Sequence, residues 1–356
     1  MVWQRTRITA AIGFIVLLAA ACGKSTASTN ANGSGNCTPS KTPVITFAAY
    51  STPREVYGKI IPAFQAKWKN EHNGQSVIVQ ESYGGSTSQA QNVANGFQAD
   101  VVALSLAPDV DIIKDAGLIT HDWTSAPDGG MVSSSVVVFD VRPGNPKGIT
   151  DWNSLTQAGL KILTPDPAQS GGARWNIVAA YGAATQGKVS GVSANDSGAQ
   201  SLLQGIFTNV IALDKNARDS IKNFESGNGD VAITYENEVL TAQKAGLPDE
   251  MVIPPATVLI QNPVAVVDKY ADDHCVQDVA KAFVDFLHSQ DAKDLYTKVG
   301  FLRPIDPATA AKGDGGTFAP ITNLFTVEDL GGWSQIDTKV FGPNGVFTAA
   351  FKATHG

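Results

Sequence analysis

The feature that most constrains the fold is a repeated alternation of short β-rich runs with segments of helical periodicity. Residues 44–50 are mainly apolar and read as a strand, and residues 53–70 carry apolar side chains at helical spacing. A second strand at 76–81 precedes a helix that starts near Ser86. Such alternation is typical of a parallel-type sheet covered by helices. We therefore predict an α/β protein.

The alternation restarts after a long apolar strand at 135–141, so the chain is predicted to form two lobes. Pro254 and Pro255 end the second set of elements. We assign 43–138 and 253–356 to lobe 1, and 139–252 to lobe 2. Open α/β sheets bind ligands beyond the carboxyl ends of their strands, so two facing lobes would share a ligand cleft.

The first 42 residues are typical of an exported lipoprotein. Arg5 and Arg7 precede an uncharged apolar run that ends at Cys22, which predicts a signal peptide at 1–21. This run is shorter than the roughly 20 apolar residues that a membrane span needs. The segment Ala19 to Cys22 resembles a bacterial lipobox, with Ala19 where leucine is usual. Residues 22–42 then form a lipidated cysteine and a flexible polar tether, and the protein is expected to be extracytoplasmic and anchored to the cell membrane.

The net charge limits which partners the protein can bind, and the cysteine content indicates whether it contains a disulfide. Without Arg5 and Arg7, 33 acidic residues face 24 basic ones, a formal charge of −9. An acidic surface argues against nucleic acid or anionic lipid as the main partner. Beyond Cys22, Cys37 and Cys275 remain. Their pairing in a disulfide is favoured in an exported chain, and two buried free thiols are the alternative.

In four places a predicted strand ends in small or polar residues and a helix follows at once. They lie at 50–53, 84–87, 170–173 and 216–218. A helix N-terminus offers unpaired N–H groups and a partial positive charge, and glycine lets a ligand approach the backbone. These are the ingredients of a tetrahedral oxyanion site. Each motif taken singly could be an ordinary N-cap or turn.

A set of motifs in a fixed order resembles the bacterial sulfate-binding proteins of ABC importers, and their thiosulfate-binding relatives, over residues 44–351. The matching stretches are 54–57, 84–86, 170–176 (Ser-Gly-Gly-Ala-Arg-Trp-Asn), 214–218, 236–238, 266–269, 303–304 and 331–333. The resemblance implies the two-lobed periplasmic-binding-protein fold of type II, with a mixed sheet flanked by helices in each lobe and the ligand cleft between them. It implies a monomeric receptor that delivers sulfate to a membrane permease and, indirectly, to its ATPase.

The resemblance also implies which groups hold the anion. They are the hydroxyls of Ser86 and Ser170 and the backbone N–H groups of Ser86, Gly171, Gly172 and Ala217. Two positions depart from the family pattern, which has Asp where Ser51 stands and Trp where Tyr235 stands. Tyr235 could donate through its phenol, although from a shorter side chain than Trp. A tyrosine packed at the end of a strand is the alternative.

Two kinds of alternative to sulfate binding exist, a different oxyanion and an enzyme. Thiosulfate or molybdate could replace sulfate as the ligand. A secreted serine hydrolase would use Ser86 or Ser170 as nucleophile and would need a histidine base. The five histidines lie in no recognisable motif, and no His, Asp or Glu cluster has metal-ligand spacing. We therefore expect no enzyme activity, no metal and no cofactor.

Overall fold

The computed structural model describes residues 37–38 and 40–355. The predicted signal peptide, Cys22 and most of the tether lie outside these residues. From Thr38 onward the chain forms one compact unit. No helix in this described part is long and apolar enough to cross a membrane. Cys37 and Cys275 are both disulfide-bonded, and their pairing with each other stays a prediction.

The first half of the chain begins a helix-covered sheet, as the alternating pattern predicts. Strand β1 (Val44–Tyr50) pairs in parallel with β2 (Ile78–Gly84) and β3 (Val101–Ala103). Its helices are α1 (Arg54–Glu71), α2 (Ser86–Ala94) and α3 (Ala107–Asp115), joined later in the chain by α8 (Asp268–Asp273), α9 (Gln277–His288) and α10 (Gln290–Lys298). In the core of this lobe the ring centroid of Phe47 lies 4.8 Å from that of Tyr57 and 5.2 Å from that of Phe283.

A second lobe repeats the plan. Strand β5 (Ile162–Pro165) pairs in parallel with β6 (Val210–Asp214) and β7 (Val231–Tyr235). Its helices are α4 (Gly171–Thr185), α5 (Asp196–Thr208), α6 (Ala217–Glu225) and α7 (Glu236–Lys244). Helix α4 is buried almost throughout, because it carries small and apolar residues on every side.

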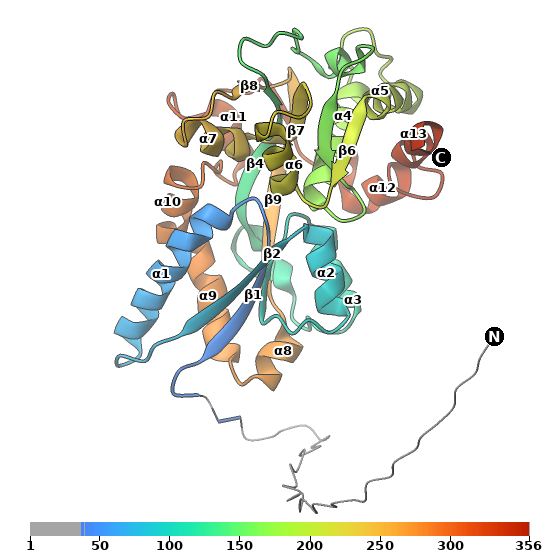
Figure 1. Cartoon of the computed structure of the whole chain (residues 1–356). Coiled ribbons are helices and arrows are strands. Elements are labelled where there is room, and N and C mark those ends of the chain that lie inside the picture. The colour runs from blue at the N-terminus through green and yellow to red at the C-terminus, as the bar shows by residue number, and fades with distance from the viewer. Residues whose placement is uncertain (1–36, 39, 356) are drawn as a thin grey trace, which may run out of the picture. The chain divides into compact units, whose positions relative to one another are not determined.

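Two long antiparallel strands, β4 (Met131–Val141) and β9 (Ala256–Val266), run from one lobe to the other. They occupy the middle of the strand order β2-β1-β3-β9-β4-β7-β5-β6 (Figure 1). Strand β9 is antiparallel to β3 and β4 is antiparallel to β7, so both halves of the sheet are mixed. The short strands β8 (Glu250–Val252) and β10 (Asn323–Phe325) pair with β4 and β9.

The end of the chain differs from the sequence prediction, which placed all of 253–356 in lobe 1. After α11 (Pro307–Lys312), helices α12 (Gly332–Lys339) and α13 (Val346–His355) pack with the second lobe. Phe207 of α5 meets Phe347 of α13 with ring centroids 5.0 Å apart. The apolar side of α13 therefore covers α5 and completes the core of that lobe.

Candidate anion-binding site

A small cavity of about 180 Å³ lies where the N-terminal ends of α1, α2, α4 and α6 converge. Five of the seven predicted ligand residues line it: Ser51, Ser86, Ser170, Gly172 and Ala217. The other lining residues are Tyr50, Thr52, Gly84, Gly85 and Ser105. None of these side chains is charged. The cavity thus offers hydroxyl and backbone groups to a bound anion, but no side chain that could form a salt bridge with it.

The helix ends at this cavity differ in how their backbone N–H groups are used. Helices α2 and α4 begin without a side-chain cap. Helix α6 is capped, because Asn216 accepts a hydrogen bond of 3.0 Å from the Asp219 N–H. An uncapped N-terminus leaves donors and a partial positive charge for a ligand. Helix α1 also begins without a side-chain cap, so α1 and α2 of the first lobe and α4 of the second are the stronger anion-binding ends.

The lobes approach each other closely beside the cavity. The Ser88 N–H of α2 donates to the Gln169 carbonyl that precedes α4, at 3.1 Å. A Cβ atom at Gly85 would lie 2.4 Å from that carbonyl and 2.8 Å from the Lys215 carbonyl. Both contacts are with backbone atoms that cannot turn aside, so this junction requires glycine at residue 85.

Ser86 contributes differently from what the sequence predicts. Its hydroxyl donates to the carboxylate of Asp109 and accepts from the Ser105 N–H at 2.8 Å. A serine hydroxyl has one proton, so none remains for a ligand. In this arrangement the proton of the Ser86 hydroxyl goes to a buried carboxylate, so donation from that hydroxyl to the anion stays a prediction. The backbone N–H of Ser86 is the donor that this arrangement leaves for a ligand.

Asp109 places a titratable group behind the cavity wall. The side chain is fully buried, and burial raises the pKa of Asp109 to about 6, against the Ser86 hydrogen bond and the charge of Arg174. One oxygen, Oδ1, has no hydrogen-bond partner among the described residues. The carboxyl is therefore close to half-protonated in mildly acidic solution.

Gly171 and Tyr235, the other two predicted residues, lie next to Ser105. Tyr235 is buried at the end of β7, and its hydroxyl oxygen is 2.6 Å from Ser105 Oγ. A Cβ atom at Gly171 would lie 3.0 Å from the same Oγ. Sequence reasoning missed Ser105. Its position just after β3 and just before α3 repeats the pattern of the four selected sites, and that signal could have found it.

Arg218 of α6 connects the two lobes at the rim of the cavity. Its Nη2 donates to the Thr52 carbonyl at 3.0 Å and to Glu55 Oε2 at 2.8 Å, both on the first lobe. Its Nε lies 2.8 Å from Oε2 of Glu238, which is in its own lobe. Burial raises the pKa of Glu238 to about 7 against the Arg218 charge. This cluster joins the two lobes beside the cavity.

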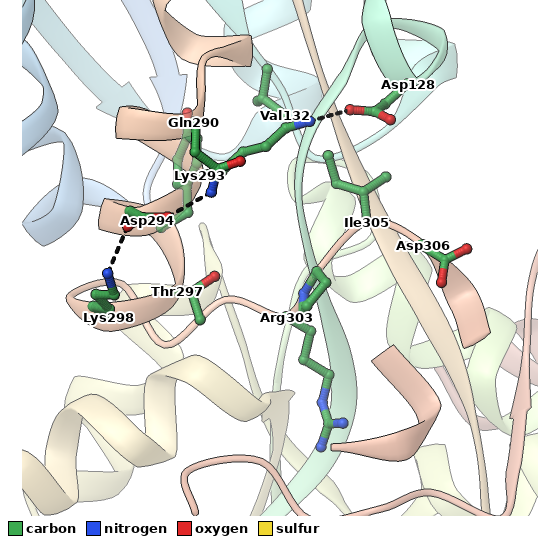
Figure 2. Close-up of a pocket in the computed structure, with 12 residues that line it drawn as sticks. Asp128, Val132, Gln290, Lys293, Asp294, Thr297, Lys298, Arg303, Ile305 and Asp306 are labelled. Carbon is green, nitrogen blue, oxygen red and sulfur yellow. Dashed lines mark hydrogen bonds and ion pairs between the residues drawn. The ribbon is translucent and has the colours of Figure 1, made fainter. Parts of the chain in front are cut away.

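A second, larger hollow of about 870 Å³ lies beside α10 and contains none of the predicted ligand residues. Figure 2 shows its charged groups paired with one another: Lys293 with Asp128 at 2.8 Å and Lys298 with Asp294 at 2.6 Å. The guanidinium of Arg303 points away to Glu236, with Nε 2.6 Å from Oε2. These cations are already neutralised.

Neither metal chemistry nor a serine–histidine pair is supported at the cavity. Among residues 37–38 and 40–355, no group of three His, Cys, Asp or Glu side chains could hold a metal ion. All five histidines are in the described part of the chain, and none lines the cavity that contains Ser86 and Ser170. The base that a serine nucleophile needs is therefore missing from this wall.

Comparison with known proteins identifies clear relatives. Residues 45–302 match the family model described as "Bacterial extracellular solute-binding protein". The chain is 41% identical to the sulfate-binding protein of Synechococcus elongatus, covering 96% of this chain and 94% of that protein. It is 34% identical to the thiosulfate-binding protein of Escherichia coli, covering 81% and 85%.

Solved structures agree with this result and with the predicted fold. The sulfate-binding protein SubI from Mycobacterium tuberculosis superposes with a TM-score of 0.74 at 36% identity, covering 83% of this chain and 98% of that one. A periplasmic thiamin-binding protein has a TM-score of 0.64 at 13% identity, which shows the fold alone. The prediction of the α/β periplasmic-binding-protein fold is confirmed.

Proposed function

Because the chain belongs to the bacterial extracellular solute-binding protein family, we propose that it captures sulfate and delivers it to an ABC importer. The observation that carries the proposal is the small uncharged cavity between the uncapped N-termini of α2 and α4. The sulfate-binding relatives cover most of the chain, which supports the same ligand.

The anion would be held by neutral donors from both lobes. On the first lobe these are Ser51 and the Ser86 N–H. On the second lobe they are the Ser170 hydroxyl and the N–H groups of Gly171, Gly172 and Ala217. Partial positive charge at the helix N-termini balances the anion without a basic side chain. Because these donors come from both lobes, bound sulfate favours the closed arrangement, by as much as its affinity differs between the two arrangements.

Selectivity follows from the donor set. Sulfate carries no proton at neutral pH and only accepts hydrogen bonds, whereas hydrogen phosphate needs an acceptor for its proton. No carboxylate lines the cavity, and Ser51 stands where the family has Asp. A site built on complementary hydrogen bonding can discriminate by about 10⁴-fold, so we predict that phosphate is rejected.

Isothermal titration against sulfate, thiosulfate, molybdate and phosphate tests this function. We expect sulfate to bind most tightly and phosphate to bind at least about 1,000-fold more weakly. Tightest binding of thiosulfate or molybdate would identify the alternative ligand within the same class. Equal competition by sulfate and phosphate would contradict the donor-only site.

The membrane attachment and partners complete the proposal. Cys22, after cleavage of residues 1–21, would carry the lipid and tether a monomeric receptor to the outer face of the cell membrane. A permease that recognises the closed lobes would read occupancy, and its ATPase would drive import. Replacing Cys22 with Ser should release the full-length protein from the membrane fraction into the soluble fraction. A variant that stays in the membrane fraction would refute anchoring through this residue.

A further inference from the structure

Ser105 stands in the cavity wall between the two lobes, and its main chain is held on three sides. Its N–H donates to Ser86 Oγ at 2.8 Å. Its carbonyl accepts from the indole of Trp175 at 2.7 Å and from the amide of Asn262 at 3.2 Å. The residue is buried. The direction of its Cα–Cβ bond is therefore fixed before any ligand arrives.

The hydroxyl of Ser105 shares one hydrogen bond with Tyr235, in which either oxygen could donate. The two hydroxyls have two protons, and the bond between them uses one. Burial raises the pKa of Tyr235, so the phenol keeps its proton at neutral pH. The side chain of Asn262 also hydrogen-bonds the phenol and lowers its pKa, as a donor to the phenol oxygen does, so Ser105 Oγ is left as the acceptor for the phenol proton. Donation from Tyr235 to Ser105 leaves the serine proton unused.

The position of the two side chains decides which proton can reach a ligand. Ser105 lines the cavity and Tyr235 does not. A Cβ atom at Gly171 would lie 3.0 Å from Ser105 Oγ, so this hydroxyl lies against the first residue of α4. A Cβ atom at Gly172 would lie 3.5 Å from Cε1 of Tyr235, so the tyrosine presents its ring edge to that glycine.

From this arrangement we infer that Ser105 donates a hydrogen bond to the anion, and that Tyr235 is a positioning residue that donates to Ser105 from behind. The inference rests on the proposed function, because it names a further donor in the same anion cavity. Tyr235 does not contact the ligand. Its phenol donates to a lone pair of Ser105 Oγ, and this hydrogen bond turns the serine proton toward the ligand. A polarised donor of this kind is strengthened by the hydrogen bond it accepts.

The test compares four proteins by isothermal titration with sulfate: the wild type, Tyr235→Phe, Ser105→Ala and the double variant. Tyr235→Phe keeps the Ser105 proton and loses only its orientation, so we expect sulfate affinity to fall about 2- to 10-fold. Ser105→Ala should weaken binding about 10- to 100-fold, as is usual for a hydrogen bond to a charged group. The double variant should bind no more weakly than Ser105→Ala, because Tyr235 acts through Ser105.

The double variant also controls for destabilisation of the fold by a buried hydroxyl that has lost its hydrogen-bond partner. Ser105→Ala alone leaves a buried phenol without its partner, whereas the double variant removes both hydroxyls. The comparison of Tyr235→Phe with the double variant therefore isolates the Ser105 hydroxyl. Thr234→Val is the matched control, because its buried Oγ1 lies on the same strand and has no partner among the described residues. We expect it to leave sulfate affinity within about twofold.

Two results would overturn the inference. One is a double variant that binds sulfate as tightly as Tyr235→Phe, since the Ser105 hydroxyl would then contribute nothing. The other is a loss in Tyr235→Phe that equals the loss in the double variant while Ser105→Ala binds normally, since Tyr235 would then be the donor itself. Failure of the wild type to bind sulfate would instead refute the proposed function, so the two failures are distinguishable.

Discussion

Two hollows in the described part of the chain, the cavity between the lobes and the hollow beside α10, differ in size and in charge, and the smaller one is the better anion site. The cavity between the lobes measures about 180 Å³ and has no charged side chain in its wall. The hollow beside α10 measures about 870 Å³ and has lysines and aspartates around it (Figure 2). An argument from volume or positive charge alone would select the larger one.

Donor availability explains why that choice is wrong. Lys293 and Lys298 already contact the carboxylates of Asp128 and Asp294. An anion in the larger hollow would have to displace these carboxylates from the lysines. The new ion pair would form at a solvent-exposed site, where it would add little to the free energy of binding. The cavity between the lobes offers N–H groups whose helices carry no cap. Unpaired donors in a water-excluded space are worth more to an anion than paired cations at the surface.

The largest effect is expected when a negative charge enters the smaller cavity. A Cβ atom at Gly172 would make ordinary contacts, 3.4 Å from Ser170 Oγ and 3.5 Å from Ala217 Cβ, so a short side chain can be built there. Gly172→Asp places a carboxylate among donors meant for the ligand. We expect at least a 1,000-fold loss of sulfate affinity by titration, because like charges in a buried site repel strongly.

Gly172→Asn is the matched control, since it has the same size without the charge. It should bind sulfate more weakly than the wild type but clearly better than Gly172→Asp. Circular dichroism should show both variants folded. A folded Gly172→Asp that keeps wild-type affinity would mean that the anion binds elsewhere, and the larger hollow would become the first candidate.

The smaller cavity could largely be predicted from the sequence, because it is built from strand–helix junctions that short sequence patterns reveal. A strand that ends in small residues before a helix is visible in the sequence, and five residues chosen this way or by resemblance line one cavity. The alternating pattern likewise predicted the α/β architecture. Both depend on short-range periodicity and on helix ends.

What could not be predicted depends on contacts between distant residues. Ser86 and Asp109 are 23 residues apart, and no local pattern indicates that the carboxylate takes the serine proton. Ser105 and Tyr235 are 130 residues apart. The packing of α13 on α5 likewise depends on which apolar surface the second lobe leaves uncovered. Each of these is decided by tertiary packing.

A smaller effect should appear in the pH dependence of the smaller cavity. The pKa of Asp109 is raised to about 6 by burial, above the usual value near 3.9. A bound anion nearby raises it further, so binding takes up a proton and sulfate affinity should fall about 2- to 10-fold as pH rises from 5 to 7.5. Asp109→Asn should flatten this profile when titrations are repeated across that range.

The same shift has a consequence for the protein without ligand. A carboxyl whose pKa is raised on folding stabilises the fold fully below its unfolded pKa, and this contribution is lost as pH rises through the folded pKa. The free energy of unfolding should therefore fall between about pH 4 and pH 6 by up to about 3 kcal/mol from Asp109. A wild-type profile that is as flat as that of Asp109→Asn would contradict the coupling.

The smallest effect is expected in the larger hollow. Lys293 and Lys298 each keep more than a third of their side-chain surface exposed, so salt screens their fields within about 8 Å at physiological ionic strength. Replacing both with Met should leave sulfate affinity within about twofold and change unfolding free energy by less than about 1 kcal/mol. A tenfold loss of affinity in titrations at physiological salt would show that these lysines hold the anion or attract it. That result would reverse the ranking of the two hollows, because paired surface cations would then outweigh the unpaired N–H groups of the cavity.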